Sequence, residues 1–202
     1  TNLLMKHIFP GAYFGNIAYF IGLINAEEII IDLGEHFVKQ TIRTRCTILG
    51  ANGPLNLSIP VIRPNGSKTQ MKDVLIEYKE NWMKNHWKAI ESAYASSPYF
   101  EAYDREIKEI LDKRYKYLRD IQEASSDFII DQLELPISLA HSETYWEGDA
   151  IDHRNDKFDE PTKSYIQVFD HEQSFSGISI IDLLMNEGPM ARNYLMNHTK
   201  IS

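Results

Sequence analysis

The sequence predicts an α+β protein in which an N-terminal β-α-β unit continues into an antiparallel meander within one mixed sheet, followed by a mainly helical C-terminal half. Three observations support this prediction. Two short apolar runs flank a segment of helical periodicity near the N-terminus. Residues 38–78 alternate apolar and polar side chains between turn motifs, as half-buried strands do. Beyond residue 80, apolar side chains recur every three or four positions, as they do on helices.

The β-α-β unit is expected within the first 32 residues. Leu3–Phe9 is apolar and stops at a Pro-Gly turn, so it predicts the first strand. Residues 13–26 carry apolar side chains at helical spacing, and Ile29–Ile31 is a β-branched run. Two strands joined by a helix over so short a distance are typically parallel.

The meander is expected to contain three strands. Cys46 and its apolar neighbours two residues apart predict a first strand that begins near Val38. Asn52-Gly53 is the strongest short hairpin signal, and the alternation resumes at 55–61 and again at 74–78. Cys46, the single cysteine of the chain, therefore falls on the apolar face and is expected to be a buried, unreactive thiol.

The helical half begins after residue 80. Asn81 is expected to cap a helix that ends before Ser97-Pro98, because the residue before proline disfavours helical backbone. Asp104 is expected to cap a longer helix that runs to about Leu135. The charges at 113–116 are expected to lie on its solvated face.

The C-terminal quarter is expected to be less regular. Residues 141–164 are polar and aperiodic, which predicts a long loop. Ser179 and Asp182 have the spacing of a capping box, and Gly188-Pro189 would interrupt the helix that they open. The chain has no internal repeat and no low-complexity linker, so we expect a single domain over residues 1–202.

Composition narrows the class of protein. Of the 202 residues, 43% are hydrophobic and 25% charged, as in soluble globular domains. The net charge is −8; residues 1–101 carry 10 Lys and Arg against 9 Asp and Glu, whereas residues 102–202 carry 11 against 20. This balance argues against a nucleic-acid partner, which needs clustered cations. No apolar run is long enough for membrane insertion, and no signal-peptide pattern is present, so we expect a cytoplasmic protein.

Several catalytic classes are excluded by missing motifs. The sequence contains no Walker A loop, no Gly-x-Gly-x-x-Gly after a strand, no Gly-x-Ser-x-Gly elbow and no His-Glu-x-x-His helix. One cysteine is too few for a typical structural zinc site. We therefore predict no cofactor and no metal.

Lys39, Arg43 and Arg45 are the main candidates for binding an anionic substrate. If this segment is a strand, all three side chains share one face, and the two guanidinium groups lie roughly 6.5–7 Å apart. That separation suits a diphosphate, or a carboxylate and a phosphate bound together. The alternative is a solvated sheet face, or arginines paired with acidic groups from the second half.

Four further residues complete the candidate site. His86 and Tyr94 lie on one expected helix and are candidate proton-transfer groups; the alternative for His86 is a histidine hydrogen-bonded within the core. Tyr13 and Asn16 lie where a strand passes into a helix, a common place for ligands in α/β units. Their alternative role is to close the core.

An acidic run in the expected loop is a weaker candidate. Asp149, Asp152, His153 and Asp156 offer oxygen and nitrogen ligands of the kind that cation sites use. A solvated acidic loop is the commoner explanation, and Arg154 within it is a further candidate for anion contact.

Taken in order along the chain, several composite motifs resemble those of the bacterial WbqC-like family. They are Pro10-Gly-Ala-Tyr-Phe14 followed by Tyr19-Phe20, Glu35-His-Phe-Val-Lys-Gln-Thr-Ile-Arg-Thr-Arg-Cys-Thr-Ile48, Gly50-Ala-Asn-Gly-Pro-Leu-Asn-Leu-Ser-Ile-Pro-Val61, Asn81-Trp-Met-Lys-Asn-His-Trp-Lys-Ala-Ile-Glu-Ser-Ala-Tyr-Ala-Ser-Ser-Pro-Tyr-Phe-Glu-Ala-Tyr103 and Ile178-Ser-Ile-Ile-Asp-Leu-Leu-Met-Asn-Glu-Gly-Pro189. The likeness covers most of the chain and is closest to the branch found in Bacteroides-type bacteria.

The resemblance implies a role in O-antigen or other cell-surface polysaccharide biosynthesis, because members of the family occur in gene clusters for those polymers. It also implies a transferase, with aminoacyl or glycine transfer as the proposed chemistry. The competing hypothesis is a non-catalytic module that binds a small molecule or a protein. The lack of a recognisable nucleophile or metal motif favours that second hypothesis.

Overall fold

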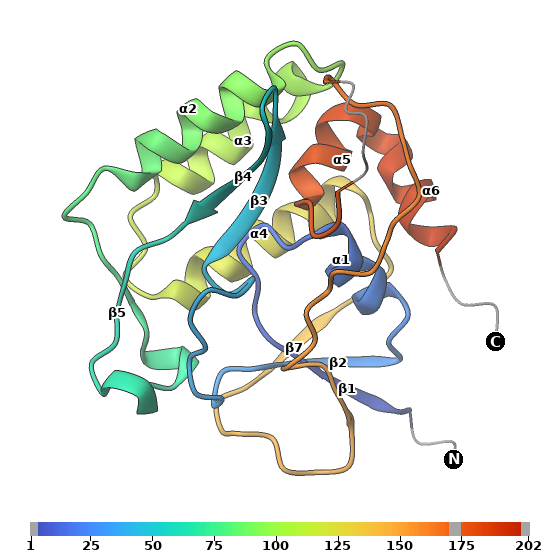
Figure 1. Ribbon diagram of the computed structural model, residues 1–202. Coiled ribbons are helices and arrows are strands. Elements are labelled where there is room, and N and C mark those ends of the chain that lie inside the picture. Colours follow the sequence, from blue (N-terminus) through green and yellow to red (C-terminus); the bar gives the residue numbers. More distant parts are fainter. Residues whose placement is uncertain (1–3, 170–174, 199–202) are drawn as a thin grey trace.

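The computed structural model describes residues 4–169 and 175–198 and is built on a parallel sheet (Figure 1). The sheet contains β1 (Lys6–Phe9), β2 (Glu28–Asp32), β7 (Leu139–Ser142) and β8 (Ile151–Asp152), in the order β7-β2-β1-β8. All three strand pairs are parallel. The carboxyl ends of all four strands therefore lie at one edge of the sheet.

The predicted parallel β-α-β unit is confirmed. Strands β1 and β2 pair with Ile8 opposite Ile30, and α1 (Ile17–Ile24) connects them. The helix starts four residues later than periodicity suggested, because the Asn16 side chain caps it by accepting the Tyr19 amide at 2.8 Å. The expected first strand also began earlier, at Leu3, which lies outside the described residues.

Residues 141–164, which were expected to form a loop, contribute to two strands of this sheet. The last two residues of β7 and the whole of β8 fall within that range. The strands have only four and two residues, so neither shows the alternation by which strands are recognised. They form because β2 and β1 offer free backbone groups at the two edges of the unit, which β7 and β8 satisfy.

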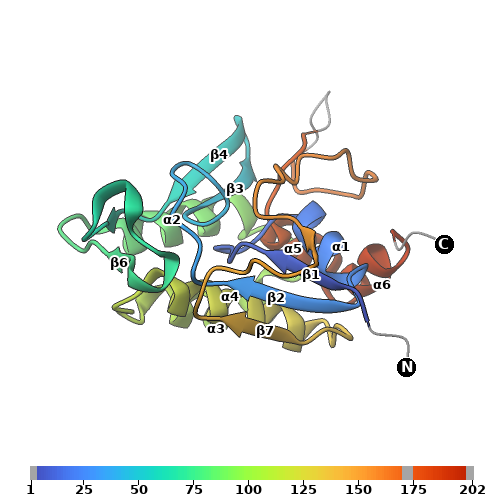
Figure 2. The same cartoon turned by 90° about the horizontal axis from the view of Figure 1, so that it is seen from below.

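The antiparallel region is not a meander within one mixed sheet, so that prediction was wrong. Strands β3 (Arg45–Gly50) and β4 (Gly53–Ser58) form the predicted hairpin, which extends away from the parallel sheet along α2 (Trp82–Tyr94) (Figures 1 and 2). Strands β5 (Val61–Ile62) and β6 (Leu75–Ile76) form a separate pair. The segment between them contains two short 3-10 turns, η1 (Gly66–Lys68) and η2 (Met71–Asp73).

The single long helix expected from Asp104 to about Leu135 is two helices, α3 (Phe100–Asp112) and α4 (Leu118–Gln132). The break has a backbone cause. The Ile76 amide donates to the Lys116 carbonyl at 3.0 Å, and the Leu118 amide donates to the Val74 carbonyl at 2.9 Å. These bonds add residues 116–118 to the edge of β6, and a continuous helix would use the same groups internally.

The remaining helices follow the predictions more closely. Asn81 caps α2 through its bond to the Lys84 amide. Ser179 caps α5 (Ile180–Glu187), after which η3 (Gly188–Met190) and α6 (Ala191–Met196) close the described chain.

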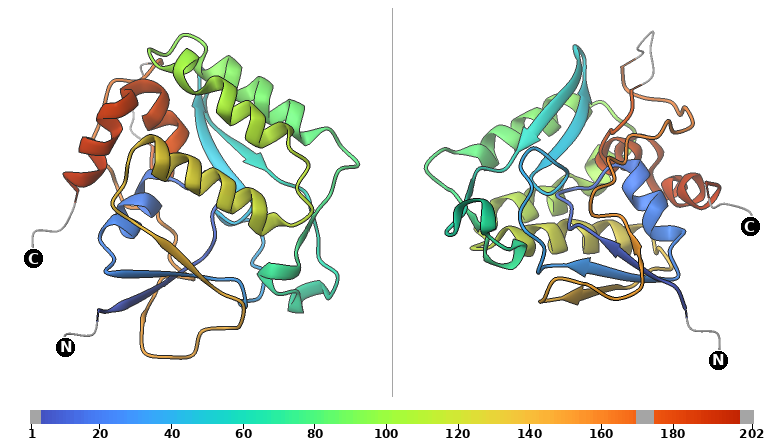
Figure 3. Two further views of the ribbon diagram at one scale, coloured as in Figure 1. Left: turned by 180° about the vertical axis from the view of Figure 1, so that it is seen from behind. Right: turned by 60° about the horizontal axis from the view of Figure 1, so that its bottom comes forward.

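The core lies between the parallel sheet and the helices, which gather on one side of the sheet (Figures 1 and 3). Phe9 and Ile31 contribute to it from the sheet, Tyr19 and Phe20 from α1, and Ile90 from α2. Over the described residues, no helix is long and apolar enough to cross a membrane.

Candidate functional site at the carboxyl edge of the sheet

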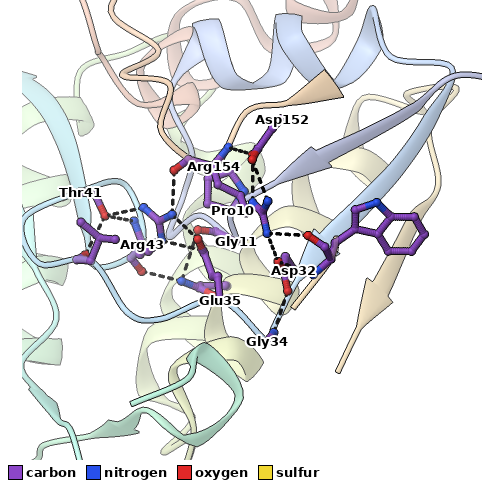
Figure 4. A network of polar contacts seen from close by, with 12 residues as sticks. Pro10, Gly11, Asp32, Gly34, Glu35, Thr41, Arg43, Asp152 and Arg154 are labelled. Carbon is purple, nitrogen blue, oxygen red and sulfur yellow. Dashed lines mark hydrogen bonds and ion pairs between the residues drawn. The ribbon is translucent and has the colours of Figure 1, made fainter. Parts of the chain in front are cut away.

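Charged side chains gather where the parallel strands end (Figure 4). Asp32 is the last residue of β2, and Glu35 follows three residues later. Asp152 is the last residue of β8, and Arg154 follows two residues later. In open α/β sheets, ligands bind in the crevice outside this edge, where neighbouring strands connect in opposite directions. In this sheet, β1 lies at that position, because β2 pairs with it on one side and β8 on the other.

Arg154 joins the ends of β2 and β8. Its Nη1 donates to Asp32 Oδ2 at 2.6 Å, and its Nε and Nη2 donate to the two oxygens of Asp152 at 2.9 and 2.7 Å. Asp32 is fully buried, and its other oxygen accepts the Gly34 amide. The hydrogen bonds and charge of the Arg154 guanidinium lower the pKa of Asp152 in this ion triad.

Arg43 forms a second buried ion pair beside the first. Its Nε and Nη2 donate to the two oxygens of Glu35 at 2.8 and 2.7 Å, the bidentate arrangement in which guanidinium and carboxylate match best. Nη2 also donates to the Arg154 carbonyl, and Nη1 to the Thr41 hydroxyl. Burial raises the pKa of Glu35, and the hydrogen bonds and charge of Arg43 oppose that rise.

A cavity of about 540 Å³ opens above these pairs. That volume lies within the roughly 300–1,000 Å³ typical of small-molecule sites. One wall is the polar face of the β3-β4 hairpin, with Arg45, Thr47 and Asn56. The segment after β8 forms another wall and includes Lys157. Among the described residues, Arg45 and Lys157 form no ion pair, so they are the cations available to a ligand.

The expected pair of guanidinium groups on one strand face is not formed. Arg43 precedes β3 in a turn, where Gln40 has a positive φ of 60°, and Arg43 is only 2% exposed. Arg45 lies on β3 and donates from Nε to Ser58 Oγ at 3.1 Å. Lys39 is exposed and does not line the cavity. The strand begins later than expected, at Arg45, because the Thr44 and Arg45 amides donate to the Thr41 carbonyl in a turn that directs Arg43 toward Glu35. Anion binding by Arg45 stays a prediction.

Asn16 also lines this cavity, whereas Tyr13 lies in the core. The Asn16 amide nitrogen donates to the Phe158 carbonyl at 2.9 Å, and its oxygen is the cap of α1. Both groups of this side chain therefore hold the cavity wall in place.

His86 is a buried histidine held by two hydrogen bonds. Its Nε2 donates to the Ser58 carbonyl at 3.2 Å, so its Nδ1 carries no proton and accepts the Tyr13 hydroxyl at 2.9 Å. Burial lowers the pKa of His86 to about 4. The imidazole is neutral at pH 7 and does not line the cavity.

Tyr94 is also buried and engaged. Its hydroxyl donates to Asp182 Oδ1 at 2.7 Å and accepts the Leu49 amide at 3.2 Å. Burial and the Asp182 carboxylate both raise the pKa of Tyr94. The Asp182 carboxylate therefore accepts from Tyr94 and does not complete the expected capping box. Only Ser179 caps the helix, by accepting the Ile181 amide. The catalytic roles of His86 and Tyr94 stay predictions, and neither side chain reaches the cavity.

The lowered pKa of His86 predicts how the stability of the protein changes with pH. Its folded pKa of about 4 lies below the roughly 6.5 of an unfolded chain, so the unfolded state binds more protons between these values. Stability is therefore lost as the pH falls through this window, by about 2 kcal/mol between pH 6.5 and pH 5. We expect His86→Gln to remove that part of the pH dependence, as measured by urea unfolding at both pH values. An unchanged slope would contradict the buried neutral imidazole.

The acidic run after β7 mostly makes internal contacts. Asp152 holds Arg154, and Asp156 accepts from His153 Nδ1 at 2.7 Å. The His153 Nε2 lies 3.0 Å from Nδ1 of His7 on β1. In the part of the chain that the structure describes, no three His, Cys, Asp or Glu side chains are placed to hold a metal ion.

Three residues of this edge were not singled out from the sequence: Asp32, Glu35 and Lys157. A usable signal existed for the first two, because acidic residues directly after a predicted parallel strand lie at its carboxyl end. Lys157 carried no signal, because its position depends on β8, which the sequence does not reveal.

The fold and this edge together define an α/β protein with a short parallel sheet and a polar cavity at the carboxyl ends of its strands. The WbqC-like protein family matches residues 11–159, which is most of the chain. The protein belongs to the WbqC-like family. Comparison with curated proteins and with solved structures found no match. Placement in the Bacteroides-type branch stays a prediction.

Proposed function

We propose that the protein is a cytoplasmic transferase that binds an anionic activated small molecule in O-antigen or other cell-surface polysaccharide biosynthesis, with aminoacyl or glycine transfer as the reaction class. The observation that carries the binding part is the 540 Å³ cavity with Arg45 and Lys157 on its walls. The biosynthetic role rests on the resemblance of the sequence motifs to the WbqC-like family.

Two cations on the cavity walls are available to an anion. Arg43 is neutralised by Glu35, and Arg154 by Asp32 and Asp152. The remaining acidic group of the lining, Asp156, is hydrogen-bonded to His153 Nδ1. Arg45 and Lys157 line the cavity and form no ion pair with a described residue, so they are the cations that an anionic ligand can contact. Charge-assisted hydrogen bonds from such groups are the strong ones in ligand recognition.

Uncharged groups on the hairpin would orient the rest of the ligand. Arg45, Thr47 and Asn56 share one face because they lie two residues apart or directly opposite each other. Thr47 Oγ1 donates to Asn56 Oδ1 at 2.6 Å, which leaves the Asn56 amide nitrogen and the Thr47 oxygen for a ligand. This set suits a molecule that combines an anionic group with a polar body.

A specific observation favours the second candidate function, a non-catalytic module that binds the same anion. The two groups proposed for proton transfer, His86 and Tyr94, are committed to hydrogen bonds in the core. The two functions share the anion site and differ only in turnover. Binding that persists without any turnover of activated aminoacyl or sugar donors would support the module.

The anion site can be tested with pyrophosphate and UDP as probes. We expect Arg45→Gln to weaken binding of both probes by about 10- to 100-fold, as loss of one charge-assisted hydrogen bond would do. Isothermal titration calorimetry at low salt gives the dissociation constants. Arg105→Gln, an exposed arginine on α3, is the matched control and should bind like the unmodified protein. Equal affinities in both variants, or no binding at all, would overturn the anion site.

A further inference from the structure

A second cavity lies beside the first and shares a wall with it. Its volume is about 380 Å³. Val38, Arg154 and Asn155 line both cavities. The rest of its lining comes from the segment after β2, from the turn at η2 and from the loop between β7 and β8: Gly34, Glu35, His36, Gln70 and Tyr145.

The second cavity differs from the first in charge. Its two charged side chains are Glu35 and Arg154, and each is held in one of the buried ion pairs. Every other lining group is neutral or, in His36, an imidazole. Burying a charged ligand here would leave its charge without a partner, at a high cost in free energy. The cavity therefore suits a neutral ligand.

Its polar groups are placed by backbone contacts. His36 and Gln70 form an isolated antiparallel bridge, and the neighbouring Phe37 amide donates to the Thr69 carbonyl at 2.9 Å. An amide, an imidazole and the Asn155 side chain thus surround one space. These groups both donate and accept hydrogen bonds, as hydroxyl groups do.

Tyr145 supplies an aromatic surface. It is 50% exposed, and the guanidinium carbon of Arg154 lies 4.1 Å from the centre of its ring. Because Asp32 and Asp152 fix Arg154, this stacking fixes the orientation of the ring. A rigid, half-exposed aromatic ring beside amide groups offers both an apolar face and polar contacts to a small ring compound.

We propose that the second cavity is a subsite for a neutral, hydroxyl-bearing ring compound such as a hexopyranoside, with Tyr145 as its stacking surface and Arg154–Asn155 as the wall that it shares with the anion subsite. This inference deepens the proposed function and rests on it, because a transferase needs an acceptor bound next to its donor. The two subsites differ in the charge of the ligand that they bind: the first binds an anion and the second binds a neutral molecule.

The experiment measures sugar and anion binding separately. Methyl β-D-glucopyranoside and methyl N-acetyl-β-D-glucosaminide are titrated into the full chain, and binding is followed by saturation-transfer NMR and chemical-shift changes. We expect Tyr145→Ala to weaken sugar binding by at least about 10-fold, as removal of a stacking ring does, and to leave pyrophosphate binding within about 2-fold. Tyr145→Phe should keep the sugar affinity, because it keeps the ring.

Tyr117→Ala is the matched control. Its ring also stacks under an arginine, with the guanidinium carbon of Arg119 5.5 Å from the ring centre, but it lies outside both cavities. Arg45→Gln should weaken pyrophosphate binding by about 10- to 100-fold and keep the sugar affinity. Saturating pyrophosphate should leave the sugar dissociation constant unchanged within about 2-fold, because the subsites are separate.

The outcomes distinguish this inference from the proposed function. If pyrophosphate binds and neither sugar does, or if Tyr145→Ala binds sugar as well as Tyr117→Ala, the second subsite is overturned and the anion site stands. If sugar binds through Tyr145 and pyrophosphate does not bind, the subsite stands and the proposed donor site fails. Should Tyr145→Ala fail to fold, Gln70→Ala with the same two readouts takes its place.

Discussion

Arg43→Met is expected to destabilise the protein by about 3–5 kcal/mol, the cost of removing one partner of a buried ion pair. The change leaves Glu35 buried without the two hydrogen bonds that now satisfy its carboxylate. It also removes the hydrogen bond from Arg43 Nη2 to the Arg154 carbonyl, which holds the backbone of the neighbouring ion triad in place. Equilibrium unfolding in urea at pH 7.5 measures the effect.

The pH dependence of this variant has a definite sign. Burial already raises the pKa of Glu35, and without Arg43 only the weaker effect of the Arg154 charge opposes that rise. A carboxyl whose folded pKa exceeds the roughly 4.3 of the unfolded chain costs stability as the pH rises through the interval between the two values. The deficit of Arg43→Met relative to the unmodified protein should therefore be smaller at pH 5 than at pH 7.5. The contribution of His86 is common to both proteins and cancels in that difference.

Two further variants control this prediction. Arg45→Ala removes an arginine two residues away that forms no ion pair with a described residue, and it should change stability by less than about 0.5 kcal/mol. The double variant Glu35→Leu with Arg43→Met removes both charges and should recover much of the loss. A double variant as unstable as Arg43→Met would show that packing of the arginine side chain, rather than the unpaired carboxylate, carries the effect.

Gly34→Ala is expected to destabilise the protein by more than about 3 kcal/mol, above the usual range for overpacking, because the added atom meets backbone. Its Cβ would lie 2.0 Å from the Tyr145 nitrogen and 2.2 Å from the Thr144 carbonyl carbon. The 144–146 segment would have to move. That movement would break the 3.2 Å bond from the Trp146 amide to Asp32 and lift Tyr145 from Arg154.

Urea unfolding and the sugar titration together test this substitution. Gly34→Ala should lower the unfolding midpoint and abolish sugar binding, because Tyr145 no longer faces the second cavity. Gly50→Ala is the control: its Cβ would meet only the Gly53 carbonyl oxygen, at an ordinary 3.9 Å. If both alanine variants unfold at the same urea concentration, the close approach at Gly34 is not a constraint on the fold.

The sequence predicted those elements whose signals are local. The hairpin signalled by Asn52-Gly53 and the cap at Asn81 are both confirmed, although the two residues of the hairpin loop are Ala51 and Asn52, because a turn or a cap depends on a few neighbouring residues. Cys46 is buried as alternation predicted, and burial raises its pKa. Parallel pairing of the first two strands followed from the helix between them.

The elements that the sequence missed are those formed by distant partners. Strand β8 has two residues, both exposed, and exists because it pairs with β1 more than 140 positions earlier. The break between α3 and α4 follows from backbone bonds to β6. Neither feature has a periodicity, so no local pattern could reveal it.

The candidate site shows the same division. The sequence by itself determined that this is a mixed α and β chain of the WbqC-like family, with Lys39, Arg43 and Arg45 close together before the hairpin turn. Only the tertiary structure decided that Arg43 forms a buried ion pair with Glu35 while Arg45 lines a cavity. The reason is physical: a strand pattern fixes the side on which a residue projects, but the partner of a buried charge depends on which distant segment folds against it.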